Sequence, residues 1–228
     1  MALAAHLDEF SRQPWRSLLL LCCAGVACLL LTERHHQHFA VAWAIMLLAM
    51  MPPLLAQPIT HIVRSSRTRR RVRALFAFGV GYTFVWMLAG PLLMVMSRLL
   101  SMATDDDGAG ALVAATLLAL VWTATPWHQV ALNRGHRIRN LAVFGWRADL
   151  DAITYGIVHG AWCVASCWAW MLVPLGAGLH HSAAMIVVTL VMLIERLAAP
   201  ARPKWRLPRP VRLLVNRFRA GARAFVTS

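Results

Sequence analysis

The stretch AITYGIVHGAWCVASCWAWMLVPLG, residues 152–176, carries no Asp, Glu, Lys or Arg. An α-helix rises about 1.5 Å per residue, and about 20 predominantly apolar residues are needed to cross the hydrocarbon core of a bilayer. This stretch is therefore long enough to cross a membrane as one helix. It also contains His159, Cys163, Cys167 and Met171, which are unusual residues to find at regular spacing in an apolar segment.

The rest of the chain has the same character. Of its 228 residues, 59% are hydrophobic, against about 45–50% apolar content in ordinary soluble domains. The sequence predicts an all-α, polytopic membrane helix bundle in which residues 1–200 form one domain. The first apolar run lacks a convincing small-residue cleavage site, so we expect a span there and not a removed signal peptide. We expect six transmembrane helices, near residues 15–32, 39–56, 74–100, 110–131, 152–176 and 180–199.

Basic residues predict the orientation of these spans. If the N-terminus is cytoplasmic, all of the 23 Lys and Arg residues except Arg34 and Arg98 fall on the cytoplasmic side. Basic residues near span ends favour that side, which places both termini in the cytoplasm. The net charge of +14 therefore reflects topology, and we expect no nucleic-acid partner.

Residues 201–228 form a basic tail rich in Pro and Arg. From Pro210 onward, apolar side chains recur at helical spacing with polar side chains between them. This pattern is typical of an amphipathic helix that lies on an anionic inner leaflet. A solvated basic tail that only enforces orientation fits the sequence equally well.

The residues His159, Cys163, Cys167 and Met171 lie four apart, so they form one column on a helix surface. Imidazole, thiol and thioether groups together favour monovalent copper, with zinc as the second choice. An imidazole at membrane depth also needs a partner, which makes His159 a functional candidate. The alternative is that the sulfur-containing side chains only fill the helix interface.

Other soft donors could support this column. In the second expected span, methionine thioethers lie just before a double proline, which is expected to kink or end the helix. These thioethers either add metal ligands or simply pack. Outer-loop histidines could capture an ion at the Met171 end of the column, or be solvated. The possible additional metal ligands are Met46, Met50 and Met51, and the possible capture residues are His35, His36, His38, His180 and His181. Met185 and three N-terminal cysteines are interpreted as packing residues, and Glu195 as an ion-pair partner of Arg196.

Enzymatic activity is not expected. The chain has no paired carboxylates, no supported Ser/His/Asp order, no phosphate-cradling glycine loop and no haem motif. A membrane thiol oxidoreductase is the remaining enzymatic alternative. The spacing of Cys163 and Cys167 is C-x-x-x-C, and both side chains point the same way from one helix, which disfavours a disulfide between them.

Four segments carry a resemblance to a known family. They are AMMPP (49–53), WTATPWHQVALNRGH (122–136), HGAWCVASCWAWM (159–171) and IERL (194–197). Together they resemble the bacterial family described as predicted metal-binding integral membrane proteins, an uncharacterised domain family of which some members are labelled copper chaperone. The resemblance covers roughly residues 40–200 and implies metal handling in a bacterial inner membrane. In two places where the family pattern has cysteine, this chain has Ser166 and Ala131.

The hypothesis that follows is a copper-handling membrane protein that accepts an ion at its outer face and holds it or passes it on. Its expected partners are the lipid bilayer and a cuproenzyme or soluble metal carrier. Two alternatives stay open: a metal permease, for which the sequence offers no internal repeat and no acidic residue within the membrane, and an assembly subunit whose cysteines are incidental.

Overall fold

The computed structural model describes residues 39–104, 108–142, 144–209, 211–212 and 215–216. All regular secondary structure in these ranges is helical, in agreement with the predicted all-α class. The expected span at 15–32 and the candidates His35, His36 and His38 lie outside them. The helices are α3 (Phe39–Met50), α4 (Ala56–Ser65), α5 (Arg71–Thr104), α6 (Ala109–Ala124), α7 (Pro126–Gly135), α8 (Gly145–Gly176) and α9 (His181–Arg196), with short 3-10 helices at Pro52–Leu55, Thr68–Arg70 and Gly178–His180.

Two of these helices, α5 and α8, are each long and apolar enough to cross a membrane. Two further candidates are bent pairs: α3 with the segment Pro52–Ser65, and α6 with α7. The described residues therefore contain two candidate spans, or four if each bent pair counts as one. From the sequence we expect five spans in the same region, because the segment of α9 is counted as well. Helix α9 has 16 residues, fewer than the about 20 that cross a hydrocarbon core.

The helix expected over residues 110–131 is interrupted, and its sequence explains the break. Thr125 has an extended backbone (φ −73°, ψ 151°), as the residue before a proline prefers. Pro126 begins α7, a position where its missing N–H is not needed. The Thr125 side chain accepts a hydrogen bond from the backbone N–H of His128 at 3.2 Å and caps the new helix. The chain bends by 73° here.

The double proline acts as the sequence predicts. Helix α3 ends at Met50, and Pro52 and Pro53 begin a 3-10 helix that leads into α4. The two halves are bent by 58°. The bend turns the chain at buried Met51 and Pro52 and leads into α4, whose Ile62 and Val63 are also buried.

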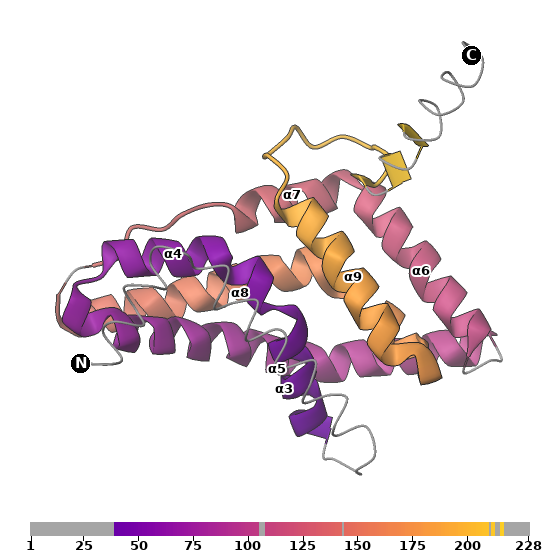
Figure 1. The fold of residues 1–228 in the computed structure, drawn as a ribbon, viewed down its shortest axis with the longest axis horizontal. Helices are drawn as coiled ribbons and strands as arrows, with labels where there is room; N and C mark the ends of the chain where they lie inside the picture. The colour runs from indigo at the N-terminus through magenta and orange to yellow at the C-terminus, as the bar shows by residue number, and fades with distance from the viewer. Residues whose placement is uncertain (1–38, 105–107, 143, 210, 213–214, 217–228) are drawn as a thin grey trace, which may run out of the picture.

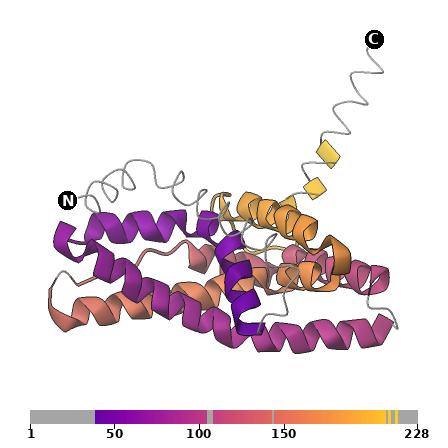
Figure 2. The ribbon, with the colours of Figure 1, turned by 60° about the horizontal axis from the view of Figure 1, so that its bottom comes forward.

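Helix α8 is the centre of the bundle, because it contacts α5, α6, α7 and α9. It runs beside α5 along much of its length, and the two helices point in the same direction (Figure 1). Helices α6 and α9 lie across the later half of this pair, as two views show (Figures 1 and 2). The residues of the α8 column therefore lie on a helix that has protein on several sides.

Two glycines allow α5 and α8 to touch through their backbones. A Cβ on Gly81 would lie 2.3 Å from the carbonyl oxygen of Ile153, and one on Gly156 would lie 2.2 Å from that of Phe78. Small residues permit such close approach between helices. The contact brings Tyr82 of α5 to the first cysteine of the column, with the hydroxyl 3.4 Å from the sulfur of Cys163.

Candidate metal centre

All four residues of the predicted column are buried. The exposed fraction is 2% for His159, 1% for Cys163, 7% for Cys167 and 0% for Met171. The helix is unbroken from Gly145 to Gly176, so their regular spacing is kept. These side chains therefore face protein and not the outside of the bundle.

A small cavity of about 10 Å³ lies beside the two thiols. This volume is close to the space that one water molecule needs. Both cysteines are free and buried. The hydroxyl of Ser166 lies 3.4 Å from the sulfur of Cys167. The cavity is lined by Leu54, His128, Leu132, Cys163, Ser166, Cys167, Trp170, Met192, Glu195 and Arg196.

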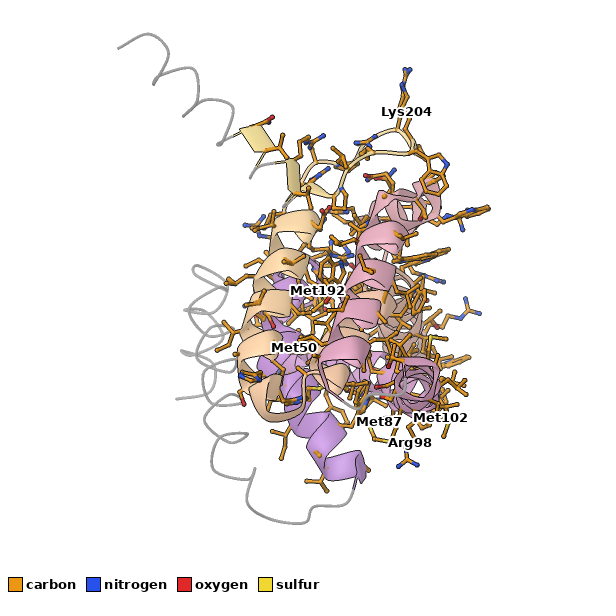
Figure 3. All side chains as sticks on the ribbon, turned by 90° about the vertical axis from the view of Figure 1, so that its right-hand side faces the viewer. Met50, Met87, Arg98, Met102, Met192 and Lys204 are labelled. Carbon is orange, nitrogen blue, oxygen red and sulfur yellow. The ribbon has the colours of Figure 1, made fainter. Side chains whose placement is uncertain are left out.

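Two further metal-binding side chains, Met192 and His128, line the cavity but were not among the residues predicted for the column. Met192 of α9 is 4% exposed and lies in the interior of the bundle, whereas Lys204 points away from it (Figure 3). His128 of α7 is buried, and its ring makes no hydrogen bond to the described residues. The signal for Met192 was present in α9, because Met192 lies four residues before Arg196 and the two therefore share one helix face.

A buried guanidinium borders the same cavity. Arg196 donates from Nη2 to the carbonyl oxygen of Gly135 at 3.1 Å and to Nε2 of His159 at 2.9 Å. Its Nη1 is buried and has no hydrogen-bond partner among the described residues. A guanidinium can only donate hydrogen bonds, so Nε2 of His159 must be the acceptor and the ring is neutral. In this arrangement, the Nε2 lone pair of His159 is used by Arg196.

Glu195 does not pair with Arg196, contrary to the interpretation from sequence. Its carboxylate accepts a hydrogen bond from the backbone N–H of Arg209 at 2.9 Å and lies 3.8 Å from the Arg209 side chain. Adjacent residues on a helix do not face each other, which explains the difference. Within the described part of the chain, Arg196 therefore has no carboxylate partner.

The other predicted donors lie elsewhere. Met46, Met50 and Met51 are buried in the same apolar core as the cysteines, but they do not line the cavity. His180 is exposed, and the Nδ1 atom of His181 lies 2.7 Å from the carbonyl oxygen of Pro174. Nowhere in the described ranges are three or more His, Cys, Asp or Glu side chains arranged to hold a metal ion. The candidate centre thus consists of two thiols with a thioether at the same cavity.

Comparisons with known proteins add one finding. Residues 40–217 match the model of a family described as PpoB2, copper chaperone. Searches of curated proteins and of solved structures found no match. The matched segment includes the helices described above, except the first residue of α3, and both thiols of the cavity. It covers well over half of the chain, and the protein therefore belongs to the PpoB2 copper chaperone family.

Proposed function

We propose that this protein is a multi-pass membrane protein that binds one monovalent copper ion between the thiolates of Cys163 and Cys167, with Met192 as a third sulfur donor. The observation that carries the proposal is that two free, buried thiols and a thioether line one small cavity in a member of a copper chaperone family. The bound copper is cargo, which the protein holds and passes to a cuproenzyme under assembly or to a soluble carrier.

The sulfur donors favour copper over zinc. Thiolate and thioether ligands select monovalent copper, whereas a structural zinc site needs four ligands in tetrahedral geometry. Met171, one turn beyond Cys167 and fully buried, extends the line of sulfur atoms toward the other end of α8. We infer that His180 and His181, near that end, capture the incoming ion; Nδ1 of His181 lies 2.7 Å from the carbonyl oxygen of Pro174, which leaves Nε2 as the ring atom for this role.

The exposed surface supports membrane insertion. Helix α5 presents large apolar side chains at intervals of three or four residues, and such a stripe is suited to lipid. Arg70 of the 3-10 helix Thr68–Arg70 pairs with Asp149 near the start of α8, and His61 of α4 is hydrogen-bonded to the backbone carbonyl of Arg139 after α7, so the basic residues of these segments gather at one end of the bundle. We assign this end to the cytoplasm of a bacterial inner membrane, in a six-span arrangement. The exposed stripe is Phe76, Val80, Phe84, Leu88, Leu92, Val95 and Leu99.

Arg196 gives the cavity a charge that suits this cargo. Binding of Cu⁺ to two thiols releases two protons and forms a bis-thiolate complex of charge −1. Glu195, which also lines the cavity, is paired with Arg209. The guanidinium of Arg196 stays protonated at all accessible pH values, so the combined charge of Arg196 and the thiol site falls from +1 to 0 on binding. A buried charge without a counter-charge is costly, and the copper complex would supply the missing negative charge.

Replacing Arg196 with methionine is therefore expected to weaken copper binding by about 10- to 100-fold, which corresponds to the loss of one buried charge interaction. Arg196→Lys, which keeps the charge, should retain most of the affinity. Competition with a chromogenic copper(I) chelator measures the copper affinity of both variants. Equal weakening in the two variants would assign Arg196 a purely structural role.

Ser166→Cys is expected to strengthen copper binding by about tenfold or more, because it adds a third thiol at the cavity. Ser166 is 2% exposed and already touches Cys167, so a thiol at this position would point toward the ion. The matched control, Ser166→Ala, should leave the affinity within about twofold of wild type, because the hydroxyl is not a soft ligand. No gain in the cysteine variant would argue that this wall of the cavity does not face the ion.

Stoichiometry tests the proposal as a whole. The purified full chain, kept reduced and free of oxygen, should bind about one copper(I) ion per chain with high affinity and prefer it to zinc. The matched control replaces Cys22, Cys23 and Cys28 with serine, because these residues lie outside the segment that matches the family. The control variant should bind copper as wild type does. Wild-type protein that retains no copper would contradict the proposal.

A further inference from the structure

A second cavity, of about 280 Å³, lies where the end of α7 and the segment after it meet the first half of α8. It shares no lining residue with the thiol cavity. Its volume approaches the lower end of the range for small-ligand sites. Its walls combine apolar side chains, such as Ile138 and Trp162, with several polar groups.

The polar groups at this cavity are strongly basic. Arg134, Arg137 and Arg139 line it, and no acidic residue does. None of the three takes part in an ion pair within the described residues. The guanidinium of Arg134 lies over the ring of Trp162, 4.6 Å from its centroid. Three guanidiniums without carboxylate partners on one cavity attract an anion.

Tyr155 adds a hydrogen-bond donor to the lining of the cavity. Tyr155 is 4% exposed, and its hydroxyl has no hydrogen-bond partner in the part of the chain that the structure describes. A tyrosine hydroxyl can donate one hydrogen bond. A ligand oxygen in the cavity would accept this hydrogen bond while the guanidiniums offset its charge.

We propose that this cavity binds a phosphate group, with Arg137 and Arg139 as its charged donors and Tyr155 as its neutral donor. Planar guanidiniums match the oxygen atoms of phosphate in charge and geometry. The apolar side chains on the wall suit the part of a phospholipid next to its phosphate. A free phosphate ion presents the same oxygen atoms, so both sources share one recognition chemistry. This inference does not rest on copper binding.

The test uses the full chain in nanodiscs, with retained lipid measured by mass spectrometry after detergent extraction. Wild type should retain phosphatidylglycerol in preference to phosphatidylcholine. The double variant Arg137→Gln/Arg139→Gln should retain at least about tenfold less phosphatidylglycerol than wild type. Tyr155→Phe should retain about two- to tenfold less. Arg64→Gln/Arg69→Gln removes two exposed arginines outside the cavity and should behave as wild type.

Inorganic phosphate provides the second arm, with binding to detergent-solubilised protein followed by phosphorus NMR line width. If wild type binds phosphate, the cavity variants do not, and no lipid selectivity is seen, the ligand is a soluble phosphate compound and the site is supported. Lipid selectivity without phosphate binding would identify a phospholipid. The proposal is overturned if wild type shows neither, or if the control variant loses as much ligand as the cavity variants. Thermal unfolding of each variant checks that it remains folded.

Discussion

Replacing Cys163 and Cys167 together with serine is expected to lower the affinity for copper(I) by about 1,000-fold or more, because serine hydroxyls are poor ligands for a soft ion. Both thiols are buried at one cavity, and serine is close to cysteine in size. The fold should therefore survive the change. Each single variant should also bind weakly, since one thiolate and one thioether cannot replace two thiolates. Competition with a copper(I) chelator under reducing conditions measures these affinities.

The N-terminal variant lacking Cys22, Cys23 and Cys28 is the matched control for this experiment, because it removes more thiols than the double variant and leaves the cavity intact. It should keep wild-type affinity. If the double variant bound copper as tightly as wild type, the buried thiols would not be ligands. Loss of copper binding in the N-terminal variant alone would show that the copper site lies outside the described helices.

Gly81→Ala is expected to destabilise the protein by about 1–3 kcal/mol, the cost typical of adding a methyl group to a packed interface. Its new Cβ would meet backbone atoms of Ile153 and Ile157 in α8, which cannot rotate away as a side chain can. The two helices would have to separate. Tyr82 would then move away from Cys163, so weaker copper binding should accompany the lower unfolding temperature.

Gly79→Ala provides the control within the same helix. A Cβ on Gly79 would have no neighbour within 4 Å, and alanine is the better helix former. This variant should be as stable as wild type or slightly more stable. Thermal unfolding in detergent micelles compares the two substitutions. Similar unfolding temperatures for both variants would show that the contact between α5 and α8 is not tight.

The helices of this fold could be read from the sequence, but their breaks only in part. The two long apolar runs that became α5 and α8 are unambiguous, and the double proline ended α3 as predicted. The break at Thr125 was missed because apolar residues continue on both sides of it. The Thr-Pro pair carried the signal, since the residue before a proline avoids the helical conformation and threonine caps the next helix.

At the candidate site, too, the sequence predicts the arrangement within one helix but not the contacts between helices. Helical spacing within one segment predicted that Cys163 and Cys167 would share a face, and both line one cavity. Met192 and Arg196 join that cavity from another helix, and periodicity within a segment cannot predict which helices pack together. Glu195 and Arg196 were paired because they are adjacent in sequence, whereas their side chains leave the helix in different directions.

X-ray absorption at the copper edge of the loaded full chain tests the central claim most directly, because it reports the atoms bound to the ion. The account predicts monovalent copper with two or three sulfur neighbours, and loss of this sulfur signal in the Cys163→Ser/Cys167→Ser variant. A first shell of nitrogen or oxygen atoms alone, or a sulfur shell that is unchanged in the double variant, would contradict it.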